Sequence, residues 1–445
     1  MKINIKRRYT PIERLLNPLN HLLQNQSTSA IITFFAVVLA MVWANSRWSE
    51  SYEALWHTPL ALTVGSFSIT QTLHVLINDG LMAIFFFSVG LEIKREIFGG
   101  ELSSPKKAIL PISAALGGML VPALIYVFFN QGTSAEDGWG IPMATDIAFS
   151  LGILSLLGKR VPISVKIFLT ALAIVDDLGA VLIIAFFYTS DIFVNDLMWG
   201  FVFLLILLLG NYVGIRNQLF YSIISIGGLW MAFFFSGVHP TIAGVLAAFT
   251  IPGRVKINEK LFLRNLDTLT NMFRKANPND NEFVTNDQME ILETIKEVSM
   301  DAATPLQKVE HSLSGFISFI VLPLFALANT GIQFQGEGLS VLMHPVSLGI
   351  GLGLIIGKFV GIVGLSKLMV SLGIAELPDR STWNHIYGVA FLAAVGFTMS
   401  LFISELAFSD DRIIQISKIS ILFTSALAGL IGYLILRFKT KPLQD

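Results

Sequence analysis

The sequence predicts an all-α polytopic membrane protein with twelve transmembrane helices. Of the 445 residues, 53% are hydrophobic and only 14% are charged, whereas about 25% of the residues of a soluble protein are charged. Apolar runs of roughly 20 residues, each long enough to cross a bilayer, recur along the whole chain. The sequence has no basic stripe that would indicate a nucleic-acid partner. It also has no cysteine, which excludes disulfides and thiolate metal sites.

The predicted spans alternate with loops that are in turn rich and poor in basic residues. Eight spans fall in residues 29–252 and four in residues 312–438. They cover residues 29–45, 71–98, 107–130, 139–158, 163–189, 196–214, 219–236, 240–252, 313–332, 345–371, 383–406 and 413–437. No Lys or Arg occurs in residues 108–158 or 167–215, whereas the loops predicted on the other side carry most of them. By the positive-inside rule, this alternation places both termini in the cytoplasm.

Four segments flank or interrupt the predicted spans. Residues 1–28 form a basic cytoplasmic segment that leads into an apolar span long enough to remain as an anchor, unlike a cleaved signal peptide. Residues 46–70 carry β-prone side chains around a Gly-Ser turn and are predicted to form an extracytoplasmic hairpin. Residues 253–311 have two amphipathic stripes and predict a cytoplasmic helical insertion, either a solvated loop or a regulatory element. Residues 439–445 form a cytoplasmic tail.

Two adjacent carboxylates, Asp176 and Asp177, lie near the middle of the span 163–189. A charged side chain at the bilayer centre costs roughly 2.5–3.5 kcal/mol on insertion scales, and neighbouring carboxylates also repel each other. They persist only if protons, a cation or a basic partner neutralise them. This pattern predicts a site where protons and a hard cation compete. The alternative is structural: one Asp caps a broken helix or pairs with a lysine.

Three other spans carry polar residues or breaks at membrane depth. Pro142 disturbs the helix ahead of Thr145 and Asp146, so these two side chains are expected to bind a cation, to cap a half-helix, or both. Lys358 lies near the middle of a glycine-rich span and is expected to pair with a buried aspartate or with the carbonyl ends of broken helices. The run Gly396–Ser400 indicates a second interruption. Interrupted spans in both halves of a chain point to a transporter site built on inverted repeats.

Further charged residues lie toward the ends of the spans. Glu92 and Arg95 belong to a cluster at the cytoplasmic end of the second span. Such a cluster is either an interface anchor whose long side chains reach water or the mouth of a cation-attracting funnel. His239 is expected at an outside turn, where it is either structural or a proton-linked element.

Six stretches along the chain match, in order, a known family of membrane transporters. They are residues 81–96, 141–149, 166–180, 236–239, 322–329 and 396–400. On these stretches the chain resembles the NhaA family of bacterial sodium/proton antiporters. The resemblance implies the NhaA fold, with inverted repeats and two crossed interrupted helices, spans 4 and 11.

The resemblance also implies roles for the residues at the predicted site. Asp176 and Asp177 would bind the cation and the proton, with Lys358 paired to Asp176. Thr145 and Asp146 would support this site.

Two regions outside that site also acquire roles from the resemblance. Glu92, Arg95, Glu310 and His311 would belong to a cytoplasmic pH-responsive region. The hairpin 46–70 would contribute to a homodimer.

The predicted function is secondary active transport without an enzymatic step or a cofactor. The resemblance implies electrogenic export of Na⁺ or Li⁺ in exchange for external H⁺, by alternating access across the bacterial inner membrane. Because burial and repulsion favour protonated carboxylates, activity is expected to rise at alkaline pH, which would serve pH and sodium homeostasis. A cation channel and a sodium-coupled solute symporter remain alternatives. A non-transporting scaffold would leave the buried carboxylates unexplained.

Overall fold

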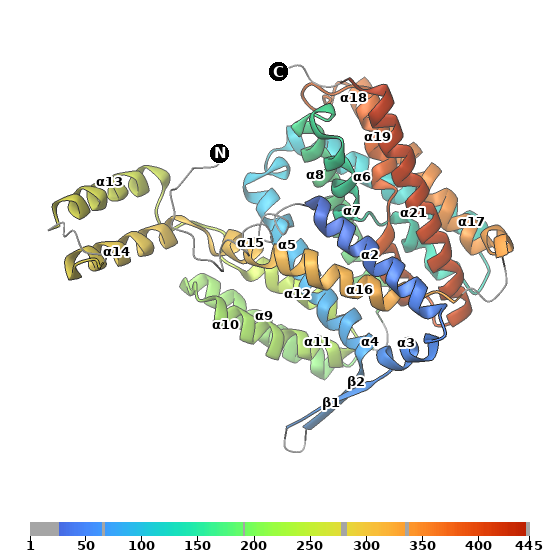
Figure 1. Ribbon diagram of the computed structural model, residues 1–445, viewed down its shortest axis with the longest axis horizontal. Coiled ribbons are helices and arrows are strands. Elements are labelled where there is room, and N and C mark those ends of the chain that lie inside the picture. Colours follow the sequence, from blue (N-terminus) through green and yellow to red (C-terminus); the bar gives the residue numbers. More distant parts are fainter. Residues whose placement is uncertain (1–25, 65–66, 190–191, 277–282, 334–337, 442–445) are drawn as a thin grey trace.

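Helices make up most of the residues that the computed structural model describes. These are residues 26–64, 67–189, 192–276, 283–333 and 338–441. Long helices pack into a bundle, and a helical hairpin and a β-hairpin project from it in different directions (Figure 1).

The first half of the chain contributes eleven described helices. They are α2 (Gln26–Ala44), α3 (Ser49–Trp56), α4 (Leu73–Val75), α5 (Met82–Gly99), α6 (Pro105–Asn130), α7 (Ile147–Leu156), α8 (Ile163–Phe187), α9 (Val194–Val213), α10 (Gln218–Ile224), α11 (Met231–Ser236) and α12 (Pro240–Thr250). Single 3₁₀ segments also occur, at Glu101–Ser103, Glu136–Met143 and Gly158–Arg160.

The second half contributes nine described helices. They are α13 (Glu259–Lys275), α14 (Asn286–Ala302), α15 (Pro305–Phe316), α16 (Leu322–Asn329), α17 (Pro345–Leu352), α18 (Lys358–Ser371), α19 (Trp383–Ala393), α20 (Phe397–Ala407) and α21 (Asp411–Lys439). A 3₁₀ segment covers Gly338–Met343. In both halves, π-helical turns join successive helices into longer rods, at Leu76–Leu81, Ser225–Trp230, Ile317–Val321 and Gly353–Gly357.

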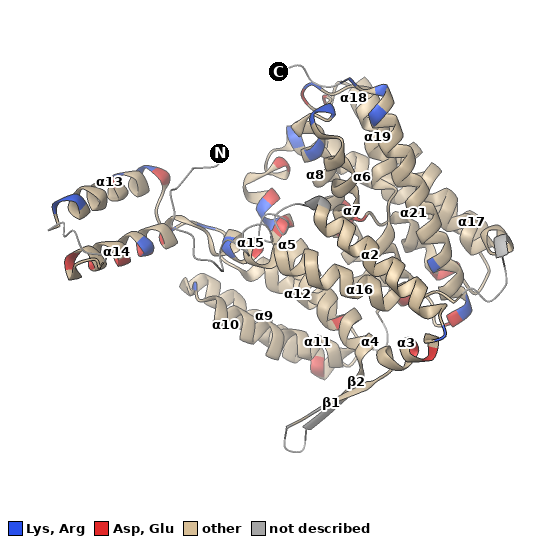
Figure 2. Cartoon of the chain, in the orientation of Figure 1, with Lys and Arg blue, Asp and Glu red and all other residues tan. Residues whose placement is uncertain are grey.

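Within the described residues, nine helical segments are long and apolar enough to cross a membrane, or eleven if each of two bent helix pairs counts as one span. The chain is therefore a multi-pass membrane protein. The remaining predicted span corresponds to α12, which has 11 residues and is too short to cross a hydrocarbon layer of about 30 Å alone. In Figure 2, long stretches of the bundle helices are uncharged, and most charged residues gather near helix ends and on α13 and α14.

The β-hairpin consists of β1 (Pro59–Val64) and β2 (Phe67–Thr72), which pair antiparallel. The predicted turn at residues 65–66 lies outside the described residues. The sequence did not predict α3, which precedes the hairpin and is bent by 117° from α2.

The helical hairpin consists of α13 and α14, which project away from the bundle (Figure 1). Leu269 and Ile291 are buried between these otherwise exposed helices. The predicted break at residues 277–280 lies outside the described residues. The helix that follows, α15, begins at Pro305, within the residues 253–311 that were predicted as the insertion. Thr304 caps that helix by accepting a hydrogen bond from the Gln307 N–H.

Backbone contact between α6 and α18 brings Lys358 into the core. A Cβ atom on Gly117 would lie 2.2 Å from the Gly361 carbonyl oxygen, and one on Gly361 would lie 2.0 Å from the Gly117 oxygen. Only glycine allows helices to approach this closely. The neighbouring Gly118 lies against Ile362 and the Lys358 stem, and a Cβ there would lie 3.0 Å from Ile362 Cγ1 and 3.5 Å from Lys358 Cδ. The amine can therefore reach the bundle centre from α18.

Candidate cation site

Two interrupted spans meet at their non-helical residues. Residues 144–146 separate a 3₁₀ segment from α7, and residues 394–396 separate α19 from α20. The pair α19 and α20 is bent by 41°. The Asp146 N–H donates to the Val395 carbonyl over 2.7 Å. Irregular backbone at membrane depth is tolerated only where protein groups satisfy it, and here each break supplies partners to the other.

Asp146 caps the half-helices that follow both breaks. Its Oδ1 accepts from the Phe149 N–H of its own α7 over 3.0 Å. Its Oδ2 accepts from the Thr398 N–H over 3.1 Å and also from the Thr398 hydroxyl. A carboxylate at a helix N-terminus pairs free N–H groups and faces the positive end of the helix dipole. Asp146 therefore joins two N-termini through one buried carboxylate.

Asp176 on α8 forms a buried ion pair with Lys358 on α18. Both side chains are fully buried, and the contact joins their Oδ2 and Nζ atoms. Thr145 from the first break completes this cluster. Its hydroxyl oxygen accepts from Lys358 over 2.8 Å and lies 2.5 Å from Asp176 Oδ2. It also lies 2.8 Å from the Ala393 carbonyl, so its single proton can go to either oxygen.

Asp177, unlike Asp146 and Asp176, has no hydrogen-bond partner for its carboxylate among the described residues. It is buried beside Asp176, with 1% of its surface exposed. In the described part of the protein, no group donates a hydrogen bond to either of its carboxylate oxygens. Burying an ionised carboxylate without a partner is costly, and a proton or a cation removes that cost. Asp177 is thus the carboxylate of this cluster whose two oxygens both lack a donor among the described residues.

A cleft leads from one end of the bundle to the breaks. Its volume is about 340 Å³, and Glu92, Asp146, His311 and Thr398 contribute to its lining. Glu92 lies on α5 and His311 on α15, toward the end where the α13–α14 hairpin leaves the bundle. The cleft thus joins Glu92 and His311, which were predicted to lie in the cytoplasmic region, to Asp146 at the first break.

The remaining residues of the charge cluster connect helices near this cleft. Arg95 pairs with Glu310 on α15 and, over 3.0 Å, with the adjacent Glu96. Lys94 is buried, and its ammonium donates to the carbonyls of Phe249 and Ile251 over 2.6 and 2.5 Å. Cations at a helix C-terminus satisfy its last carbonyls, so Lys94 ties α5 to the end of α12.

The sequence matches the family described as Na⁺/H⁺ antiporter 1 over residues 20–436. The chain belongs to this family. It is 47% identical over 428 residues to the Na⁺/H⁺ antiporter NhaA of Oleidesulfovibrio alaskensis, an alignment that covers 96% of this chain and 95% of that protein. It is also 47% identical over 417 residues to Na⁺/H⁺ antiporter NhaA 1 of Psychromonas ingrahamii, covering 93% and 95%. The identity to NhaA of Sulfurimonas denitrificans is 44% over 431 residues, covering 96% and 97%. Membership of the Na⁺/H⁺ antiporter 1 family confirms the resemblance predicted from six short stretches.

His239 of this Na⁺/H⁺ antiporter 1 family member lies away from the carboxylate cluster. Its Nε2 lies 3.6 Å from Asp79 Oδ1 on the π-helical turn before α5. Its ring packs edge-on against Phe402 of α20, with centroids 5.5 Å apart. Phe402 also contacts Phe86 and Phe325, and all three phenylalanines are fully buried. These three rings form a buried aromatic layer against which His239 packs.

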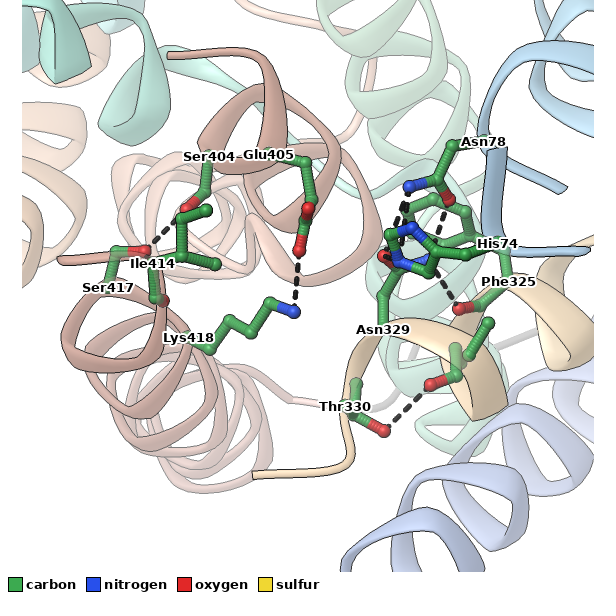
Figure 3. A network of polar contacts seen from close by, with 12 residues as sticks. His74, Asn78, Phe325, Asn329, Thr330, Ser404, Glu405, Ile414, Ser417 and Lys418 are labelled. Atoms are coloured by element: carbon green, nitrogen blue, oxygen red, sulfur yellow. Dashed lines mark hydrogen bonds and ion pairs between the residues drawn. The ribbon is translucent and has the colours of Figure 1, made fainter. Parts of the chain in front are cut away.

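Beyond this layer, the antiporter fold carries a polar network that the sequence analysis missed (Figure 3). Glu405 on α20 and Lys418 on α21 form an ion pair of 2.5 Å, with about one sixth of each side chain exposed. His74 Nε2 lies 3.1 Å from Asn329 Oδ1, and Asn329 Nδ2 donates to Asn78 Oδ1 over 2.9 Å. The available signal was weak, because single polar residues near span ends are common in membrane helices.

Proposed function

We propose that this chain exports Na⁺ or Li⁺ in exchange for external H⁺, with Asp177 as the group that binds either the cation or the proton. Asp176 and the Thr145 hydroxyl supply further oxygen atoms, and Lys358 balances the charge of Asp176. Asp146 holds the two breaks together around this site.

The observation that supports this proposal best is the difference between two adjacent carboxylates. Asp176 has an ammonium partner and a hydroxyl neighbour, whereas both oxygens of Asp177 lack hydrogen-bond donors among the described residues. An ionised carboxylate without a partner at this depth can be neutralised in two ways, by binding a proton or by binding a small cation. Since each excludes the other, binding of one releases the other.

Competition at one site also gives the direction of the pH dependence. When Asp177 is mostly protonated, raising the pH by one unit removes nine tenths of the competing protons. The half-saturating Na⁺ concentration should then fall by up to about tenfold per pH unit. Activity should therefore rise toward alkaline pH, where the cation wins the site. Glu92, Arg95, Glu310 and His311 surround or adjoin the cleft and would modulate this response from the cytoplasmic side.

The same proposal includes the arrangement of the chain in a bacterial inner membrane. Twelve spans, counting α12, would place both termini and the α13–α14 hairpin in the cytoplasm. Spans 4 and 11 would cross at their breaks as parts of two inverted repeats. The bundle would then expose Asp177 to each side in turn. Exchange at Asp177 alone moves one proton for each sodium ion, so more protons entering than sodium ions leaving would require a second proton carrier, a role open to the buried Asp176–Lys358 pair. The β-hairpin would pair with a second copy in a homodimer.

Exchange in everted membrane vesicles tests the function directly. Vesicles energised to accumulate protons quench a pH-sensitive dye, and Na⁺ addition should restore its fluorescence only when the protein is present. The half-saturating Na⁺ concentration is measured from pH 6.5 to 8.5. Control vesicles receive K⁺ or choline instead. If Na⁺ produces no response, or if its half-saturating concentration is the same at every pH, the proposed competition is wrong.

Electrogenicity needs a second experiment with purified protein in liposomes. An imposed membrane potential should change the exchange rate when proton and sodium numbers differ. Sodium flux that persists without any proton gradient and without proton movement would favour a channel.

A further inference from the structure

A serine occupies the fourth position of each half-helix that follows a break. α7 begins at Ile147 and carries Ser150, and α20 begins at Phe397 and carries Ser400. Both serines are fully buried. The two positions are therefore equivalent along the two interrupted spans, although 250 residues separate them.

The two serine hydroxyls bind across the breaks in a reciprocal way. Ser150 donates to the Leu392 carbonyl of α19 over 2.7 Å. Ser400 donates to the Ile141 carbonyl, in the 3₁₀ segment before the first break, over 2.8 Å. Each bond thus runs from the second half of one interrupted span to the first half of the other.

The acceptors are carbonyls near the ends of helical segments, and that of Leu392 also accepts from the Val395 N–H over 3.1 Å. Leu392 immediately precedes Ala393, whose carbonyl lies 2.8 Å from the Thr145 hydroxyl. Ile141 lies four residues before Thr145 in the other interrupted span. Both serine bonds therefore hold backbone that supports Thr145, and Thr145 in turn contacts Asp176 and Lys358.

We propose that Ser150 and Ser400 are positioning residues that set the cation affinity of the Asp177 site by fixing the two breaks against each other. Neither hydroxyl contacts Asp176, Asp177 or Lys358, so neither serine binds the cation. This inference rests on the proposed sodium/proton exchange.

Single Ser150→Ala and Ser400→Ala variants test the proposal in the everted-vesicle assay. Each should raise the half-saturating Na⁺ concentration by roughly fivefold, the effect of about one hydrogen bond, while the maximal rate stays within about twofold of the parent. Ser150→Thr and Ser400→Thr keep the hydroxyl and should restore most of the affinity. Sodium-dependent thermal stabilisation of the purified proteins gives the same affinity without turnover.

Ser113→Ala serves as the matched control. Ser113 lies on α6 and donates to Ile109 of its own helix over 2.7 Å, so its loss frees no carbonyl of another span. It should leave the half-saturating Na⁺ concentration unchanged.

Two outcomes would overturn the positioning role. One is an unchanged Na⁺ affinity in both alanine variants, and the other is a lower maximal rate with unchanged affinity. Failure of the proposed function is distinguishable, because the parent protein itself would then give no Na⁺ response.

Discussion

The regions around Asp146 and Asp177 contain equally buried carboxylates with opposite surroundings. Asp146 is 2% exposed and accepts three hydrogen bonds, from Phe149 and twice from Thr398. Asp177 is 1% exposed, and within the described residues its oxygens accept none. Burial alone therefore does not distinguish a carboxylate that is held in place from one that has no partner. The hydrogen bonds do, because they stabilise a carboxylate in one position and one charge state.

The Asp146 region is costly to change because its bonds connect α7 and α20. The Asp177 region is adaptable because its carboxylate has no bonds to lose when a proton or cation arrives. Four substitutions test this difference between Asp146 and Asp177, and they follow in order of decreasing expected effect.

Replacing Asp177 should abolish exchange without unfolding the protein. Asp177→Asn keeps the shape of the side chain but removes the charge that binds a cation. We expect exchange at the level of vesicles that lack the protein, and a melting temperature equal to or above that of the parent, because an unpaired buried charge has been removed. The exposed Asp411 on α21 provides a control, since Asp411→Asn should exchange normally. Parent-level exchange by Asp177→Asn would refute the role of this carboxylate.

Replacing Lys358 should cause the largest loss of stability. Lys358→Met leaves the Asp176 carboxylate buried without its ammonium partner, and breaking a buried pair costs about 3–5 kcal/mol. The double variant Lys358→Met/Asp176→Asn removes both charges and should recover most of this loss. Unfolding in mixed micelles measures the difference. Lys367→Met, at an exposed position of the same helix, loses only the contacts of its ammonium with the Trp383 and Tyr387 rings and should cost about 1 kcal/mol. Equal stability of the single and double variants would show that the loss does not come from an unpaired Asp176 carboxylate.

Replacing Asp146 should destabilise the crossing of the two breaks. Asp146→Ala removes a cap from both α7 and α20, and we expect a loss of about 2–4 kcal/mol in unfolding free energy. Asp146→Asn keeps one acceptor oxygen, so its unfolding free energy should lie between those of the parent and of Asp146→Ala. Asp410 caps α21 at an exposed site through the Arg412 N–H, so Asp410→Ala should cost about 1 kcal/mol or less. If both alanine variants lose the same stability, Asp146 does not join the two half-helices.

The smallest effect is expected in the polar network beyond the aromatic layer (Figure 3). Glu405→Gln breaks the pair with Lys418, which is partly exposed, so it should cost about 1–2 kcal/mol, between surface and buried pairs. Its half-saturating Na⁺ concentration should match the parent, because Glu405 pairs with Lys418 and not with a residue of the carboxylate cluster. A changed Na⁺ affinity would show that this network belongs to the transport site.

Much of the candidate site could be found from the sequence because charges are rare inside apolar spans. Asp176, Asp177 and Lys358 stand out against their neighbours without any knowledge of the fold. Serines do not, since they are common in membrane helices and their partners are invisible in sequence. Ser150 and Ser400 were therefore missed as cross-span contacts.

Two features of the fold were missed for local reasons. Helix α3 has only eight residues and mixed polarity, so an apolar-run criterion passes over it. Helix α15 begins at a polar turn, where Thr304 and Pro305 provide a cap and a first-turn proline. These capping signals mark the start of the helix, whereas hydropathy marks only the start of its apolar part.

From the amino-acid sequence one can tell that the chain crosses a membrane repeatedly and carries two acids and an amine at membrane depth. Composition and spacing suffice for this, because the cost of a charge in hydrocarbon does not depend on the fold. Only the tertiary structure decided which acid is paired. Lys358 is 182 residues from Asp176, and Thr398 is 252 residues from Asp146. Such contacts arise from the way helices pack, and they leave Asp177 as the carboxylate without a partner.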